Sequence, residues 1–253
     1  MTDPTQGWTP VRKVRAHEQV MAQIEQRILD GELAAGDHLP NERDLSAMLG
    51  VSRPSLRESL RVFEALGIVE IRRGGEGGSV LAGEPGPAFV NLLKLQLALG
   101  QFSPHDVLDT RVALETWSCH EAARRATPED HAALAAILDE MDDPEISAGE
   151  FNRLDAAFHV LIAEASTNAL SAHLMQSLRI AINRQMIDAY ARLDDWRETA
   201  KTVRAEHRRI LELIRQRDSA GASDAVRDHI ASFYALGGLS REAAAAPDGG
   251  ARP

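Results

Sequence analysis

Apolar residues recur every three to four positions along most of this chain, which is the period of an amphipathic α-helix. After residue 88 the pattern predicts seven helices, over about residues 88–99, 104–125, 128–141, 150–166, 170–192, 196–216 and 222–236. Before residue 83 it predicts three helices, over about 14–30, 42–48 and 53–65, and then two strands at about 68–73 and 79–82. The sequence therefore predicts a mainly α fold, with a small mixed N-terminal domain and a C-terminal all-helical bundle of about seven helices.

A stretch rich in glycine and proline, residues 83–87, separates the two patterns and is typical of a linker. We therefore expect one domain in residues 1–82 and a second in residues 88–240. Residues 241–253 are rich in alanine, glycine and proline, which predicts a disordered tail.

Four polar side chains interrupt the apolar stripes of the C-terminal helices. Asp155 and His159 lie four residues apart on one stripe, and His207 and His229 lie on two others. A buried carboxylate or imidazole must be paired, hydrogen-bonded or bound to a metal. Three imidazoles and one carboxylate on helices that pack together suggest a divalent metal site; the alternative is a set of hydrogen-bonded core histidines. This donor set suits Zn, Ni, Mn, Fe or Co, and on an octahedral ion it leaves two positions open.

The composition limits the cellular compartments in which we expect the protein. No apolar run approaches the roughly 18 residues of a membrane-spanning helix, and the N-terminal residues lack the apolar core of a signal peptide. The single cysteine, Cys119, excludes an internal disulfide and fits a reducing compartment. We therefore expect a cytoplasmic protein without a membrane contact.

The net charge of −10 is unusual for a protein that binds nucleic acid, yet one segment is basic. Residues 51–73 carry five arginines against three glutamates. Two short helices joined by a tight turn and followed by a hairpin form a winged helix-turn-helix, whose second helix enters the DNA major groove. Arg53, Arg57 and Arg61 form one stripe of that helix, where a guanidinium can donate to guanine or phosphate. The alternative is a solvated arginine face, and any DNA contact must come from a small patch.

The run LPNERDLSAMLGVSRPSLRESLRVFEALGIVEIRRG resembles the winged-helix signature of the GntR family of bacterial transcription factors. The rest of the chain resembles the all-helical FCD ligand domain of the FadR subfamily. The marks of that domain are Asp109 and Arg111 followed by Glu115, the stretch from Asp155 to His159, the pair Glu206 and His207, and His229. The resemblance implies a homodimer, in most members a repressor, that binds a palindromic double-stranded operator and releases it on binding a metabolite.

The resemblance also implies site residues. The residues that match the DNA contacts of the family are Arg43, Ser52, Arg53, Ser55 and Arg57, with the wing glycines Gly75 and Gly77 near the minor groove. The wing departs from the family pattern, since Glu76 at its tip would repel phosphate.

The metal positions of the family match Asp155, His159, His207 and His229, with zinc as the ion expected in the purified protein. In metal-binding members the effector is a small carboxylate that ligates the metal. Arg111 matches an arginine that points towards it in some relatives; the alternative is an ion pair with Glu115 on the helix surface.

Three hypotheses follow. The first is a DNA-binding transcriptional regulator, expected to be a repressor, that is controlled by a small carboxylate bound at the metal. The second is a metal-responsive regulator in which the ion itself is the signal. The third is a metal-dependent hydrolytic enzyme, since such a site can activate water. No general base at motif spacing stands out, no catalytic residue is predicted, and an enzyme would leave the N-terminal domain unexplained.

Overall fold

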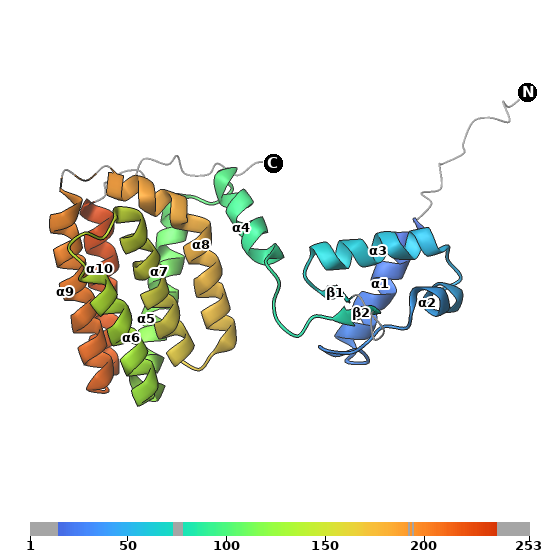
Figure 1. The fold of residues 1–253 in the computed structure, drawn as a ribbon, viewed down its shortest axis with the longest axis horizontal. Coiled ribbons are helices and arrows are strands. Elements are labelled where there is room, and N and C mark those ends of the chain that lie inside the picture. The colour runs from blue at the N-terminus through green and yellow to red at the C-terminus, as the bar shows by residue number, and fades with distance from the viewer. Residues whose placement is uncertain (1–14, 73–77, 192, 194, 237–253) are drawn as a thin grey trace, which may run out of the picture. The chain divides into compact units, whose positions relative to one another are not determined.

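The computed structural model describes residues 15–72, 78–191, 193 and 195–236 of the chain. These residues form ten helices and one two-stranded sheet, so the predicted mainly α fold is confirmed (Figure 1). They fall into two compact units, one ending at Phe89 and the other beginning at Val90. The predicted tail of residues 241–253 lies outside the described residues. Within them, no helix has the length and apolarity that crossing a membrane requires.

The N-terminal unit contains α1 (Ala16–Leu29), α2 (Glu42–Met48), α3 (Arg53–Ala65), β1 (Val69–Arg72) and β2 (Gly78–Leu81). Two side chains cap its short helices: Asn41 accepts a hydrogen bond from the N–H of Asp44, and Ser52 accepts one from the N–H of Ser55. The apolar side of α3 then packs on α1, and both helices share one core. Its most buried members include Val20, Ile24, Leu56, Leu60 and Phe63. The opposite side of α3 stays in solvent.

The backbone between α3 and the hairpin passes close to the backbone of Gly86. Gly67 has a φ of +71°, and a Cβ there would lie 2.8 Å from the Cα of Gly86, so only glycine fits without a shift. The strands pair antiparallel, with Val69 opposite Leu81. Three helices followed by a hairpin is the element order of a winged helix-turn-helix.

The C-terminal unit contains α4 (Ala88–Ala98) from Val90 onward, α5 (Pro104–Arg125), α6 (Pro128–Met141), α7 (Ala148–Ala165), α8 (Ala169–Ala191), α9 (Trp196–Arg215) and α10 (Ser219–Leu236). Hydroxyl groups of Ser103, Thr127 and Ser147 cap α5, α6 and α7. Proline in the first turn of α5 and of α6 costs no hydrogen bond there. The seven helices predicted from periodicity are present, with ends that differ by at most three residues.

Helix α5 lies at the centre of this bundle, against α7, α8, α9 and α10. The core is apolar and continuous, and its fully buried members include Phe151, Phe158, Ile162, Ile182, Ile210 and Ile214. The four predicted metal-site residues are also buried and lie on these same helix stripes. The packing that closes the core therefore also positions the candidate site.

Candidate metal centre and DNA-contacting helix

The fold brings all four predicted metal-site residues together. Asp155 and His159 come from α7, His207 from α9 and His229 from α10, and each offers a ligand atom within 4.8 Å of the others. The two Nε2 atoms of His207 and His229 are 3.2 Å apart. The Oδ1 atom of Asp155 lies 3.4 Å from His207 Nε2. Three helices, of which α7 is separated from the other two by α8, thus direct ligand atoms at one point.

Two outer carboxylates orient the imidazoles. Nδ1 of His159 lies 2.7 Å from a carboxylate oxygen of Glu115, and Nδ1 of His229 lies 2.7 Å from one of Glu206. Since an ionised carboxylate only accepts, each Nδ1 carries the proton and each Nε2 keeps its lone pair. Carboxylates hold the histidines of metal sites in this manner.

The hydrogen bonds of the cluster bear on the choice between a metal site and a set of core histidines. Within the described residues, the buried Nε2 of His159 and Nδ1 of His207 have no hydrogen-bond partner. The nearest carboxylate oxygen to His159 Nε2, Oδ1 of Asp155, is 3.9 Å away, too far for a hydrogen bond. A lone pair and a carboxylate oxygen left facing each other in a core are costly unless a cation lies between them. The four residues therefore fit a divalent metal, and the donor set leaves its identity open.

Burial and the neighbouring charges keep the imidazoles of His159 and His207 in their neutral form. Burial, aided by the charge of Arg179, lowers the pKa of His159 to about 4, against the opposing effect of Glu115. Burial and the neighbouring His229 and His159 hold the pKa of His207 well below its usual value. Both side chains are neutral at pH 7, which is the form that ligates a metal.

Sequence reasoning missed Arg179, a buried residue of α8 that belongs to the site. Its Nη1 donates to Asp155 Oδ2 at 3.0 Å, and its Nη2 donates to Glu115 Oε2 at 3.1 Å. Burial by itself would raise the pKa of Glu115, but the charges of Arg179, His159 and Arg111 hold it well below its usual value. The missed signal was an arginine beside Leu178 on an otherwise apolar stripe, the same kind of signal that identified His207.

Arg111 forms the ion pair with Glu115 that was the alternative to an effector contact, but it does so in the core. Its Nε donates to Glu115 Oε1 at 2.9 Å, so the ion pair exists, but the Arg111 side chain is only 3% exposed. The prediction of a helix-surface pair was wrong about the surface, because Arg111 lies on the side of α5 that faces α10. Its Nη1 lies 3.4 Å from the hydroxyl of Tyr234. A small cavity beside the cluster is lined by Arg111, Asn152, Asp155, Arg179, Met186, Tyr190, His229, Ile230 and Phe233.

The predicted DNA-contacting arginines lie in solvent on the N-terminal unit. Arg57 Nε donates to Glu42 Oε2 at 2.7 Å, and Arg53 Nη2 lies 3.7 Å from the same oxygen. Arg43 of α2 is 81% exposed and lies beside Asp44. Ser52 is the exposed cap of α3 and Ser55 is half-buried behind it. The wing residues Gly75, Glu76 and Gly77 lie outside the described residues.

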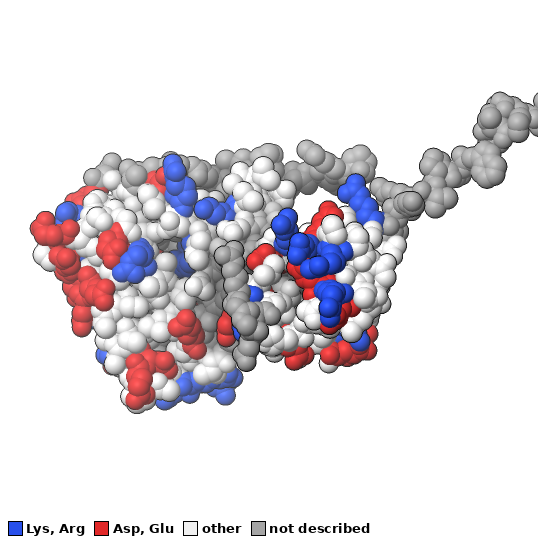
Figure 2. All heavy atoms as spheres, turned by 45° about the vertical axis from the view of Figure 1, so that its right-hand side comes forward, with Lys and Arg blue, Asp and Glu red and all other residues white. Residues whose placement is uncertain are grey.

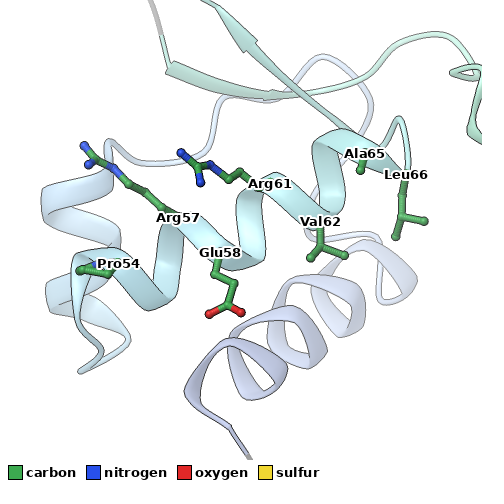
Figure 3. Close-up of a pocket in the computed structure, with 7 residues that line it drawn as sticks. All are labelled: Pro54, Arg57, Glu58, Arg61, Val62, Ala65 and Leu66. Atoms are coloured by element: carbon green, nitrogen blue, oxygen red, sulfur yellow. The ribbon is translucent and has the colours of Figure 1, made fainter.

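The exposed side of α3 forms an open groove. Figure 3 shows Arg57 and Arg61 extending from one side of the helix and Glu58 from another, with Val62 and Leu66 further along. Figure 2 shows acidic side chains close to the basic ones on the visible face, so the positive charge is local. Any attraction of α3 to DNA therefore comes from a small basic patch and not from a broad positive field, as the composition predicts.

Comparisons with known proteins agree with both units. Residues 16–77 match the gntR family of bacterial regulatory proteins, and residues 106–232 match the FCD domain. The chain is 31% identical over 220 residues to the Glc operon transcriptional activator of Escherichia coli K12, covering 84% of this chain and 85% of that protein. It is 29% identical over 226 residues to the putative L-lactate dehydrogenase operon regulatory protein of the same strain, covering 87% and 85%.

One solved structure supports the fold as a whole. Streptococcus agalactiae GntR aligns with a TM-score of 0.62 and 26% identity, covering 85% of this chain and 97% of that one. A winged helix-turn-helix joined to an effector-binding helical bundle defines a DNA-binding transcriptional regulator. This chain belongs to the GntR family, with the FCD domain of its FadR-like subfamily. The family consists of regulators, so the hypothesis of a hydrolytic enzyme is wrong.

The buried histidines make the stability of the metal-free protein depend on pH. The pKa of His159 is about 4 in the folded protein, against 6.5 for an unperturbed histidine, so the unfolded chain binds more protons between these values. The contribution is present above pH 6.5 and is lost as pH falls towards 4, by up to about 3 kcal/mol for this shift. Urea unfolding of chelator-treated protein at a series of pH values measures this loss.

Two variants isolate the source of the pH dependence. His159→Gln removes one of the two buried imidazoles whose pKa is lowered and should make the fall in unfolding free energy over this interval less steep. His120→Gln, at a partly exposed position of α5 outside the cluster, should keep the slope of the parent protein. An equally steep fall in His159→Gln would show that the buried imidazole is not responsible.

Proposed function

We propose that this regulator controls its operator through a small carboxylate metabolite bound at a divalent metal in the helical bundle. Asp155, His159, His207 and His229 would hold the metal, with zinc expected in the purified protein and Ni, Mn, Fe or Co as the other candidates. The observation that carries the proposal is the buried, unpartnered Nε2 of His159 next to the carboxylate of Asp155 and the other two imidazoles. The metal would supply open positions for carboxylate oxygens.

The neighbouring cavity supports the class of effector. Arg111 lines it together with Asn152 and Tyr190, which places a buried guanidinium and two polar side chains next to the candidate metal ligands. Apolar side chains close its other side and the cavity has room for only about one water molecule, so even a short acid would have to move some of these side chains, and a long chain is excluded. The name of the E. coli relative linked to an L-lactate dehydrogenase operon agrees with an acid of this size.

The response would pass through the packing of the bundle. The metal-site residues lie on α7, α9 and α10, so a ligand among them biases the arrangement of these helices. In a dimer, a small shift changes the separation of the two DNA-binding helices, and half-site spacing makes operator affinity sensitive to it. In this proposal the protein is a repressor that the acid releases from DNA.

For the DNA-binding half we propose contacts by Arg43, Ser52, Arg53, Ser55 and Arg57, with α3 in the major groove. The exposed ion pairs of Arg53 and Arg57 with Glu42 are weak, so a phosphate or guanine can replace the carboxylate. Contacts by Gly75 and Gly77 stay a prediction. We also propose the domain limits 1–82 and 88–240, joined by the linker 83–87.

A homodimer on a palindromic operator completes the proposal, because a single winged helix buries too little surface for specific affinity. Helix α4 supports it. The side chains of Leu93 and Leu97 pack on the core of the bundle, whereas Leu92 and Leu95 of α4 and Leu99 directly after it are 56%, 61% and 73% exposed. Such a row of exposed leucines is suited to cover a second copy of the same surface.

Recognition-helix arginines should divide by role. Arg53→Ala is expected to cost about 1–3 kcal/mol at one operator base pair and to relax the preference there, as the loss of a bidentate guanine contact does. Arg57→Ala should weaken specific and random DNA alike if it contacts phosphate. Fluorescence anisotropy with operator and single-base variants at fixed salt measures both, with Arg27→Ala on α1 as the exposed control. Parent-like operator affinity in Arg53→Ala would contradict the assignment.

The α4 surface should determine the oligomeric state. Leu92→Glu introduces a charge into the exposed leucine row and should convert a micromolar dimer to a monomer, with weaker operator binding. Leu170→Glu, at a 67% exposed position on α8, is the matched control. Sedimentation velocity distinguishes them. A parent protein that is monomeric and still binds one half-site tightly would argue against the dimer.

Removal of one candidate ligand residue should abolish both metal binding and the release of DNA that the acid induces. His207→Ala is expected to lose metal binding and acid-induced release of DNA while DNA binding survives, because the N-terminal unit has its own core. His120→Ala, at the partly exposed position of α5, serves as the control. Calorimetry with lactate, pyruvate, glycolate, sugar acids and dicarboxylates compares metal-loaded with chelator-treated parent protein. An acid with equal affinity for both forms would mean that the metal does not receive the effector.

The same titrations also test the alternative hypothesis, in which the metal ion itself is the signal. Under that hypothesis, metal alone changes operator affinity and no acid is needed. Under the carboxylate proposal, operator affinity changes only when acid is added to the metal-loaded protein.

A further inference from the structure

Two arginines on the exposed side of α3 share one carboxylate. Glu42, the first residue of α2, accepts a hydrogen bond from Nε of Arg57 at 2.7 Å, and the same oxygen lies 3.7 Å from Nη2 of Arg53. The side chain of Glu42 is 34% exposed, so it belongs to the surface on which both arginines lie. A carboxylate in this position opposes the binding of phosphate to the arginines, because like charges repel.

The helix-turn-helix holds Glu42 in this position. The side chain of Asn41 accepts a hydrogen bond from the N–H of Asp44 and fixes the first turn of α2, to which Glu42 belongs. Leu45, about one turn further on, is buried in the core that also contains the apolar side of α3. Negative charge is favourable at a helix N-terminus. The backbone of α2 therefore keeps this carboxylate beside the two arginines.

The geometry of the Arg57 contact favours bases over phosphates. A guanidinium that donates to a carboxylate from Nε still has two Nη groups, and these together match the O6 and N7 acceptors of guanine. Guanine carries no net charge, so Arg57 can contact it while the hydrogen bond to Glu42 persists. A phosphate on the same arginine must either displace the carboxylate or lie beside it, and at such short separations the repulsion is appreciable even in water.

We propose that Glu42 is a specificity-determining residue of this regulator, which holds Arg57 by Nε for reading bases and repels the phosphates that Arg53 and Arg57 would otherwise bind. This role rests on the proposed function, in which the two arginines contact DNA. Phosphate contacts supply nearly all of the affinity for random DNA, whereas base contacts specify the operator. Glu42 therefore weakens binding to random DNA and raises the ratio of operator affinity to random affinity.

The first test compares two variants that each lose one negative charge. The operator is the duplex that the parent protein selects from a random-sequence library, and a scrambled duplex of the same composition serves as random DNA. Glu42→Gln keeps the size of the side chain and removes its charge, so it should bind the scrambled duplex at least about threefold more tightly than the control. The control is Glu32→Gln, which removes the same charge from the exposed pair of Glu32 with Arg27.

Two readouts separate this role from a merely structural one. The ratio of operator affinity to scrambled affinity should be at least about threefold lower in Glu42→Gln than in Glu32→Gln. The slope of log affinity against log salt on scrambled DNA should steepen by about 0.9 for each phosphate contact that Glu42→Gln gains. Glu42→Asp keeps the charge, so its affinity ratio should lie closer to that of the parent than the ratio of Glu42→Gln does.

A second variant tests the geometry with Glu42 intact. Arg57→Lys keeps the positive charge but has a single ammonium group, which cannot donate to Glu42 and fork onto guanine in the way that a guanidinium does. It should bind the scrambled duplex about as tightly as the parent and lose at least about tenfold in operator affinity, as the loss of one bidentate base contact does.

The outcomes distinguish the role of Glu42 from the DNA contacts themselves. Parent-like operator affinity in both Arg53→Ala and Arg57→Ala overturns the contacts. If these variants lose operator affinity while Glu42→Gln and Glu32→Gln have equal affinity ratios, the arginines contact DNA and the role of Glu42 is wrong. A ratio in Glu42→Asp as low as in Glu42→Gln overturns the charge effect. An Arg57→Lys protein that keeps the ratio of the parent overturns the role even if Glu42→Gln does not fold.

Discussion

The helical bundle depends on one buried carboxylate, that of Glu115. It accepts hydrogen bonds from Arg111 on its own helix, from His159 on α7 and from Arg179 on α8. Each of these groups would be expensive in an apolar core without its partners. These groups form one network. The loss of one member is destabilising, because it leaves the buried charges of its partners unpaired. Three helices are therefore tied at the place where the candidate ligands converge.

The candidate site and the hydrophobic core are the same structure. The ring of His207 stacks on Phe158 with 4.6 Å between centroids, and Phe158 adjoins His159 on α7. A ligand that draws the imidazoles together acts directly on side chains that pack α7 against its neighbours. Binding at such a site is linked to folding of the bundle, which is how a small ligand can change the arrangement of whole helices.

The N-terminal unit uses charge in the opposite way. Arg53 and Arg57 share the carboxylate of Glu42 in solvent, where ion pairs contribute little free energy. These arginines can exchange partners, whereas Arg111 and Arg179 cannot leave theirs without a buried replacement. The same residue type thus serves exchangeable surface contacts in one unit and fixed electrostatic balance in the other, and burial makes the difference.

The sequence by itself determined the helices and the four converging residues, because periodicity reports which face of each helix is buried. It placed Asp155, His159, His207 and His229 on apolar stripes, and packing brought those stripes together. Only the tertiary structure decided that Arg179 joins them, that Glu115 orients His159, and that Arg111 is buried. Such pairings depend on the rotation and spacing of one helix against another. Those are set by the packing of the whole core, and no local pattern within a single helix encodes them.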